Sequence, residues 1–250
     1  MKLESKSTPN QASVMILFHQ FFDETSSTLT YLLADPITGD AVIIDPVSEH
    51  IGAYISFLQE QELQLGWVLD THVHADHITG AAGLREYTGA RSAVGAGCAV
   101  DCADRLLQDG DTIVFGNEVL RVIPTPGHTS NCVTFHWRDR LFTGDALLIG
   151  GCGRTDFQGG DAGLLYDSIT ERLFPLPDET LVYPGHDYKG ARVSCIGQEK
   201  GSNPRLAGRS RQEFIQLMTH LNLPRPLMMD SALPANQRCG RTRNIEIHGT

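Results

Sequence analysis

The sequence has 250 residues, with 20 lysines and arginines against 30 aspartates and glutamates and a formal net charge of −10 at pH 7. This negative balance argues against nucleic acid or an anionic membrane as the main partner, because no positive field would attract either one. No apolar run approaches the roughly 18 residues of a transmembrane helix. The start of the chain lacks the apolar core of a secretory signal, so we expect residues 1–13 to form a polar tail on a cytoplasmic protein.

Apolar runs and helical patterns alternate over residues 14–250, which we expect to fold as a single domain. The β-rich runs lie at residues 14–21, 28–34, 41–45, 67–71, 112–115, 119–124, 133–137, 141–143 and 180–183. Helical patterns lie at residues 51–61, 81–87, 164–174 and 212–221. This order indicates sheets covered by helices, in two halves, with a short and largely irregular extension from about residue 205 to residue 250.

The six cysteines occupy positions 98, 102, 132, 152, 195 and 239, and none of them forms a CxxC pair. A core of this size needs no disulfide staples, so we expect free thiols in a reducing compartment. Cys98 and Cys102 have no histidine beside them, and we expect small core residues rather than metal ligands there.

The strongest local signal is the segment THVHADH at residues 71–77, which directly follows an apolar run. It places four metal-ligand side chains within six residues at the end of a predicted strand: His72, His74, Asp76 and His77. Imidazole and carboxylate ligands together suit zinc, iron, manganese or nickel.

Three later β runs end in the same way, in a turn that contains a histidine or an aspartate. These residues are His128, Asp145 and His186, and each has a glycine beside it. Glycine allows the tight turns and the close backbone approach that such a site needs. Four such segments in one chain predict a single metal site at one edge of a sheet.

This ordered set of residues resembles the metallo-β-lactamase superfamily. The resemblance implies an α/β fold, the αββα four-layer sandwich, with the metal at one edge. Longer segments resemble the persulfide dioxygenases within that superfamily: residues 71–80, 126–129, 143–149, 151–158, 183–188, 203–206, 221–224 and 234–240. That resemblance implies one non-haem Fe(II) per chain, in an enzyme that oxidises glutathione persulfide with O2 and water to sulfite and glutathione.

By the same resemblance, His72, His128 and Asp145 hold the iron, and Tyr188 acts beside them in catalysis. Arg154, Tyr188 and Arg205 are the expected substrate-binding residues, since a guanidinium can bind a carboxylate of glutathione with two hydrogen bonds. The remaining residues of the set are expected to hydrogen-bond the ligands or bound water: His74, Asp76, His77, His186 and Asp187. We further expect a homodimer, with any rhodanese-type sulfurtransferase partner on a separate chain.

The alternative is a glyoxalase II-like thioester hydrolase, a dinuclear enzyme of the same fold with the same seven residue types at its metals. In that enzyme class His74, Asp76, His77 and His186 would be ligands, and a bridging hydroxide would attack a carbonyl. The segment GRTDFQ at residues 153–158 favours the dioxygenase, as does the shortness of the chain after His186. A member of the fold without catalysis is a third possibility, and the complete set of metal-type residues argues against it.

Overall fold

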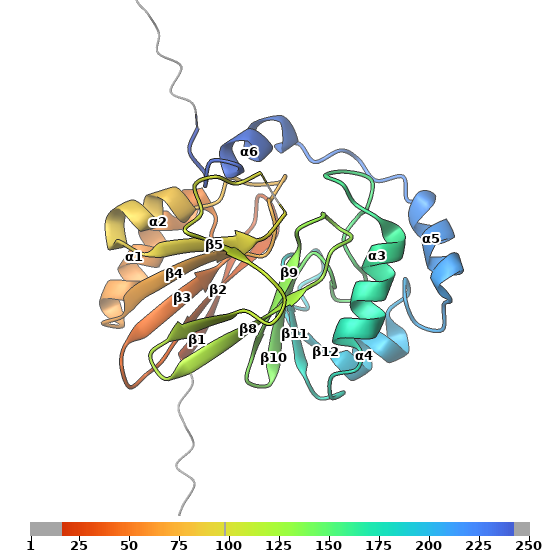
Figure 1. Cartoon of the computed structure of the whole chain (residues 1–250), viewed down its shortest axis with the longest axis horizontal. Helices are drawn as coiled ribbons and strands as arrows, with labels where there is room; N and C mark the ends of the chain where they lie inside the picture. The colour runs from red at the N-terminus through yellow and green to blue at the C-terminus, as the bar shows by residue number, and fades with distance from the viewer. Residues whose placement is uncertain (1–16, 98, 243–250) are drawn as a thin grey trace, which may run out of the picture.

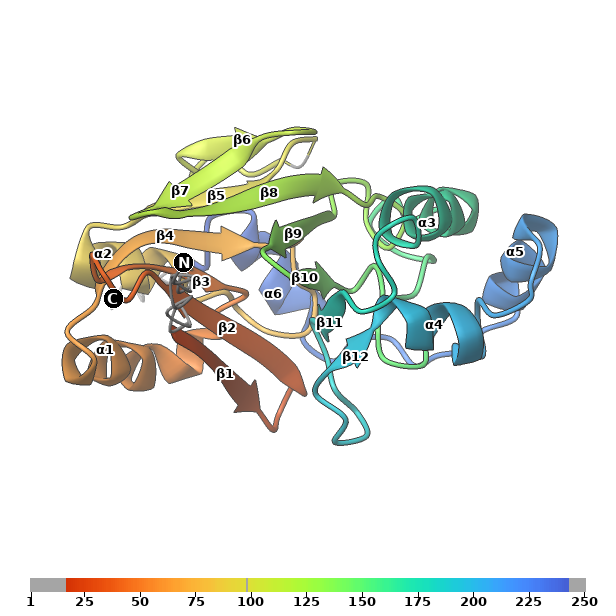
Figure 2. The same ribbon diagram turned by 90° about the horizontal axis from the view of Figure 1, so that it is seen from below.

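The computed structural model describes residues 17–97 and 99–242. The tail expected at residues 1–13, the beginning of the strand expected at 14–21, Cys98 and residues 243–250 lie outside these ranges. The described residues form two six-stranded sheets with helices on their outer faces (Figures 1 and 2).

The first sheet contains the N-terminal strands in sequence order. They are β1 (Leu17–Asp23), β2 (Thr28–Ala34), β3 (Asp40–Ile44), β4 (Gln64–Asp70), β5 (Arg91–Gly95) and β6 (Arg105–Leu107). The strands β1, β2 and β3 are antiparallel, and β3 to β6 run parallel to one another.

The second sheet has the order β12-β11-β10-β9-β8-β7. Its strands are β7 (Thr112–Phe115), β8 (Glu118–Pro124), β9 (Val133–Trp137), β10 (Arg140–Gly144), β11 (Leu181–Pro184) and β12 (Ser194–Cys195). Only β10 and β11 pair in parallel; the other neighbours in this sheet are antiparallel.

Helices cover the outer face of each sheet. Two lie on the first sheet, α1 (Ile51–Glu60) and α2 (Ala81–Thr88). On the second sheet lie α3 (Ala162–Asp167), a π-helical turn (Ser168–Leu173), α4 (Ile196–Ser202) and α5 (Arg211–Thr219). The layers therefore follow the order α, β, β, α, which confirms the predicted fold class.

Strand β2 shows why the sequence folds into layers. All seven of its residues are buried, although a strand at a surface would alternate between buried and exposed. Leu29, Tyr31 and Leu33 point into the core between the two sheets, whereas Leu32 and Ala34 point into the core beneath α1 and α2. This period of two is the side-chain geometry of a strand that is covered on both faces.

The structure differs from the predicted elements in several short segments. β5, β6, β12 and α4 lie where no element was expected, and the helix expected at 164–174 is divided into α3 and the π-helical turn. A further helix, α6 (Met229–Asn236), lies in the extension expected to be largely irregular, although it contains Pro234. Within the described residues, no helix is long and apolar enough to cross a membrane.

The expectation that all cysteines are free thiols is wrong for two of them. Cys102 and Cys239 form a disulfide, although 137 positions separate them in sequence. Cys102 nevertheless packs against the core beneath α1 and α2, as expected of a small core residue. Cys132, Cys152 and Cys195 are free thiols, and the first two are buried. Burial raises the pKa of Cys152 to about 11, so its thiol stays protonated at neutral pH.

Candidate metal centre

The metal-type residues converge because the two sheets end at a common edge. The loop after β4 contains the THVHADH segment, and the turns after β8, β10 and β11 contain His128, Asp145 and His186. Backbone hydrogen bonds join the sheets here: the Val133 amide donates to the carbonyl of Thr71 at 2.9 Å, and the Leu29 amide donates to that of Gly185 at 2.8 Å.

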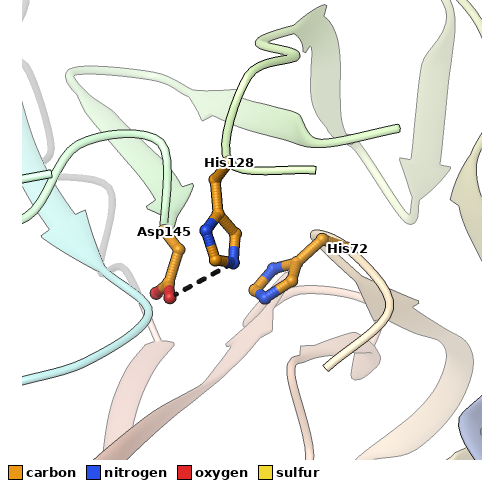
Figure 3. A group of neighbouring side chains, drawn as sticks. All are labelled: His72, His128 and Asp145. Atoms are coloured by element: carbon orange, nitrogen blue, oxygen red, sulfur yellow. Dashed lines mark ion pairs between the residues drawn. The ribbon is translucent and has the colours of Figure 1, made fainter. Parts of the chain in front are cut away.

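Three side chains from different segments point toward one another at this edge (Figure 3). His72, His128 and Asp145 each offer one ligand atom, and these atoms lie within 4.8 Å of one another. The Nε2 atom of His128 lies 3.6 Å from Oδ2 of Asp145, a distance too long for a hydrogen bond. These are the three residues that the sequence singled out as metal ligands.

Hydrogen bonds orient the His72 ring. The hydroxyl of Thr71 donates to Oδ2 of Asp45 at 2.9 Å, so its oxygen accepts the proton of His72 Nδ1 at 3.0 Å. The Thr71 amide donates to the other carboxylate oxygen of Asp45 at 2.7 Å. Because Nδ1 holds the ring proton, Nε2 of His72 presents its lone pair.

A hydrogen bond at Nδ1 orients the His128 ring as well. Its Nδ1 donates to the backbone carbonyl of Arg154 at 2.7 Å, which again leaves Nε2 with a lone pair. This contact requires glycine at position 153, because a Cβ there would lie 2.4 Å from the carbonyl oxygen of Asp145 and 2.7 Å from Nδ1 of His128. Burial lowers the pKa of His72 well below its usual value, so that ring is neutral as a ligand must be.

The carboxylate of Asp145 is ionised. Burial alone would raise its pKa, but the surrounding imidazoles, His186 foremost and then His128 and His72, together outweigh burial and lower that pKa well below the usual range. The Nδ1 atom of His186 donates to Oδ1 of Asp145 at 2.6 Å, and its Nε2 donates to Oδ2 of Asp76 at 3.0 Å. Because both nitrogens donate to carboxylates, His186 is a cation, and these carboxylates raise its pKa well above the usual value despite burial.

The other two histidines of the THVHADH segment, His74 and His77, form hydrogen bonds with carboxylates. Nε2 of His74 donates to Oδ1 of Asp45 at 3.1 Å, and Nδ1 of His77 donates to Oδ2 of Asp76 at 2.9 Å. Burial would lower the pKa of His74, yet Asp45 raises it to about 9. The other ring nitrogens of His74 and His77 are buried and have no hydrogen-bond partner.

This donor set fits a divalent transition metal. Two neutral imidazoles and one carboxylate, with open positions beside them, are the ligands of mononuclear non-haem iron sites. The hydrogen bonds to Thr71 and to the Arg154 carbonyl fix the ligand rings in the orientation that a metal requires.

A cleft of about 610 Å³ adjoins these ligands and extends away from the sheets. Its walls include the three predicted substrate residues, Arg154, Tyr188 and Arg205. Arg154 pairs with Asp156, and its guanidinium also donates to a backbone carbonyl in the C-terminal extension. Arg205 donates to the carbonyl of Cys152. Tyr188 is 68% exposed.

Tyr188 stacks flat against His186, with ring centroids 5.6 Å apart. Asp187 belongs to the turn that follows β11. Its Oδ1 accepts hydrogen bonds from the amides of Lys189, Gly190 and Ala191. The hydrogen bonds of Asp187 therefore shape the turn that presents Tyr188.

Sequence reasoning missed several residues of this region. Asp45 is the last residue of a predicted β run, and Asp145 lies just beyond the end of another, so the position of Asp45 was an available signal. Asn236 of α6 donates to the carbonyls of His74 and His77, both at 2.8 Å. Residues 223–227 and Met229 close one side of the cleft, and Arg225 lies among them. Nothing in the local sequence places that extension beside the metal ligands.

Comparison with known proteins defines the family. Residues 24–186 match the family described as the metallo-beta-lactamase superfamily, and the chain belongs to it. Within that superfamily it belongs to the persulfide dioxygenases. It is 47% identical over 227 residues to human persulfide dioxygenase ETHE1, mitochondrial, a match that covers 90% of this chain and 89% of the human protein.

The crystal structure of ETHE1 from Myxococcus xanthus has 52% sequence identity and a TM-score of 0.89, and the match covers 90% of this chain and all of that one. A hydroxyacylglutathione hydrolase of Cereibacter sphaeroides is less similar, at 37% identity over 179 residues, which cover 68% of this chain and 67% of the hydrolase. The chain thus resembles the dioxygenases over more of its length and at higher identity than it resembles this hydrolase.

Proposed function

We propose that this persulfide dioxygenase holds one Fe(II) per chain and oxidises glutathione persulfide. In the overall reaction, glutathione persulfide, O2 and water give glutathione and sulfite, and both atoms of O2 enter the product. The observation that carries this proposal is the convergence of two imidazole nitrogens and one carboxylate on a single point beside the cleft.

His72, His128 and Asp145 would hold the iron. Bound there, Fe(II) supplies the redox chemistry between O2 and a persulfide sulfur, since one carboxylate and two imidazoles leave coordination positions open. Two features favour a single metal. Nε2 of His74 is bound to Asp45, and both ring nitrogens of His186 are bound to carboxylates, those of Asp145 and Asp76. These ring nitrogens orient the carboxylates around a single metal position.

The cleft has the chemistry to bind an anionic thiol conjugate. Glutathione carries two carboxylates, and three arginines line the cleft of a protein with a formal charge of −10. The guanidinium of Arg225 pairs with Asp230, whose side chain is 82% exposed. Exposed ion pairs contribute about 0–1 kcal/mol, so a substrate carboxylate displaces Asp230 at little cost. We assign Arg225 to carboxylate binding together with the predicted Arg154 and Arg205.

Tyr188 and His186 have complementary roles in this proposal. The exposed phenol ring of Tyr188 lies in the wall of the cleft, where it can pack against the substrate and donate a hydrogen bond to it. The cation of His186 holds Asp145 in its ionised form and fixes one of its oxygens, so the other oxygen faces the metal position.

The unpartnered nitrogens of His74 and His77 favour one other function, the dinuclear thioester hydrolase. Loss of the His74 proton would offer a second metal both of these nitrogens. The two functions predict different metal contents and different reactions.

The test uses protein purified without oxygen and supplied with Fe(II). We expect about one iron per chain, persulfide-dependent uptake of O2 at an electrode, and release of sulfite. Two metals per chain, hydrolysis of S-lactoylglutathione and no uptake of O2 would instead establish the hydrolase.

A further inference from the structure

The disulfide lies at the end of a segment that covers the cleft. We call residues 222–241 the C-terminal strap. The beginning of the strap lines the cleft with residues 223–227 and Met229. The strap then forms α6, which lies above the gap between the two halves of the fold in Figure 1.

The strap is attached to the body through buried side chains of α6, and through hydrogen bonds and a disulfide near its two ends. Near its start, Arg154 donates to the carbonyls of Leu223 and Pro224 at 3.2 and 2.6 Å. At the end of α6, Asn236 accepts from the amide of Thr79 at 2.9 Å and also holds the metal-binding loop through the carbonyls of His74 and His77. The disulfide follows, three residues beyond Asn236.

The disulfide joins the strap to the loop between β5 and β6. Cys239 is only 4% exposed, whereas Cys102 is partly exposed. A small cavity lies between the disulfide and the metal ligands and is lined by Cys239, Asn236, His74 and His72. The covalent bond therefore lies directly behind the loop that supplies the first metal ligand.

We propose that the Cys102–Cys239 disulfide is a reversible modification site that low-molecular-weight thiols open, and that opening it loosens the strap over the cleft. The partial exposure of Cys102 decides which sulfur is attacked. A solvent thiolate reaches Sγ of Cys102, while the buried Cys239 is the leaving group.

Thiol–disulfide exchange at this bond proceeds in two successive displacement steps. The thiolate forms a mixed disulfide with Cys102, the bond to Cys239 breaks, and Cys239 leaves as a thiolate that takes up a proton. A second thiol attacks the mixed disulfide, which releases the oxidised thiol dimer and the free Cys102 thiol. Two thiols are oxidised to one disulfide, and the protein disulfide is reduced to two thiols; the reverse reaction closes it again.

Within residues 17–97 and 99–242, the disulfide is the only covalent bond besides the backbone that attaches the strap to the body. Reduction breaks this bond. The buried side chains of α6, the hydrogen bonds of Asn236 and a few backbone bonds, such as that from the Ala82 amide to the Cys239 carbonyl at 2.8 Å, then hold this end of the strap. Once the disulfide is reduced, these contacts can open without the breaking of a covalent bond. We therefore expect larger local opening of the strap in the reduced protein.

The test compares the oxidised wild type, the wild type reduced with glutathione, and the variant Cys102→Ser. Cys195→Ser is the matched control, because Cys195 is also partly exposed but forms no disulfide. Hydrogen exchange of the strap amides is the first readout. We expect it to be about tenfold faster in the reduced protein and in Cys102→Ser, with unchanged exchange in α1.

The second readout is substrate affinity, and it rests on the proposed function. We expect the KM for glutathione persulfide to rise about three- to tenfold on reduction, with kcat nearly unchanged, because the strap forms one wall of the cleft. In Cys102→Ser the KM should no longer respond to the ratio of reduced to oxidised glutathione, whereas Cys195→Ser should respond as the wild type does.

Three results would overturn the inference. One is a non-reduced peptide digest without a Cys102–Cys239 cross-link. Another is an equal rate of hydrogen exchange at the strap amides in oxidised and reduced wild type. This comparison does not depend on the folding of any variant. The third is a KM that, under oxidising conditions, is raised as much by Cys195→Ser as by Cys102→Ser. Hydrogen exchange is measured without turnover, so an enzyme that fails to oxidise persulfide but shows the exchange change would refute the proposed function and not the thiol-sensitive strap.

Discussion

The hydroxyl of Thr71 links the buried carboxylate of Asp45 to the ring of His72, and its removal tests how the metal centre is oriented. Thr71→Val keeps the shape of the side chain and removes only this hydroxyl. His72 Nδ1 then loses its acceptor in a fully buried site. An unsatisfied buried donor costs about 1–3 kcal/mol, equivalent to about a 5- to 150-fold change in an equilibrium constant.

The loss of this hydrogen bond should weaken iron binding. The ring can find a new partner for Nδ1 only by changing its tautomer or by rotating, and both changes remove the lone pair of Nε2 from the metal position. Changing a residue that hydrogen-bonds a ligand typically weakens metal binding about 10- to 100-fold, which agrees with the hydrogen-bond figure. We expect Thr71→Val to raise the dissociation constant for Fe(II) within that range. The control Thr71→Ser retains the hydroxyl and should bind iron nearly as the wild type does.

The assay is anaerobic competition between the protein and a coloured Fe(II) chelator. Thermal unfolding of the metal-free proteins separates a local effect from a general loss of stability. If Thr71→Val binds iron as tightly as Thr71→Ser at equal metal-free stability, the Asp45–Thr71–His72 chain does not orient the ligand.

Three further predictions concern the ligand set, the cleft and the second sheet. His128→Ala should lose most bound iron, while His74→Ala should retain about one iron per chain by elemental analysis; equal loss in both would contradict the mononuclear site. Arg225→Gln should raise the KM for glutathione persulfide about 10- to 100-fold through loss of a charge-assisted hydrogen bond. Asp230→Asn should lower it by up to about fivefold by freeing that guanidinium, and an unchanged KM in both variants would exclude the pair from substrate binding. Hydrogen bonds from the neighbouring arginine and tryptophan side chains lower the pKa of Glu118, so Glu118→Gln should cost about 1–2 kcal/mol of unfolding free energy at pH 7. The difference in urea midpoint from wild type should vanish as the pH falls through the lowered folded-state pKa of this carboxyl group.

The stabilisation by Glu118 should decrease, not increase, as the pH falls. Because the arginine donor and then the tryptophan donor hold the folded-state pKa of Glu118 below its unfolded value, the stabilisation is complete above the unfolded pKa and is lost as the pH falls through the folded one. A difference that instead grows on acidification would show that the carboxylate is not stabilised by these donors.

The group of candidate ligands was predictable because each of its members follows an apolar run. In THVHADH and at His128, Asp145 and His186, the local sequence indicates both the strand and the turn that follows it. The layered fold follows from the same runs, because a strand such as β2, with Leu29, Tyr31 and Leu33 on one face and Leu32 and Ala34 on the other, must be covered on both faces.

The remaining features depend on contacts between distant segments. The pairing of Cys102 with Cys239 spans 137 positions, and no spacing rule indicates it. The strands β5 and β6 are short, and the pairing of β5 with β4 and of β6 with β5 decides their structure. Likewise, the predicted role of Arg154 rested on its charge, whereas its donation to Pro224 depends on where the strap lies.

The ligands come from both sheets: His72 follows a strand of the first, and His128 and Asp145 follow strands of the second. A bound metal is therefore a cross-link between the two halves of the fold, and it stabilises their association in proportion to its affinity. The converse also holds, since a small sliding of one sheet over the other changes the distances among the three donors. Residues deep in the interface between the sheets, such as Phe135 and Tyr31, thus influence these distances, and with them the affinity for a metal, without lining the site.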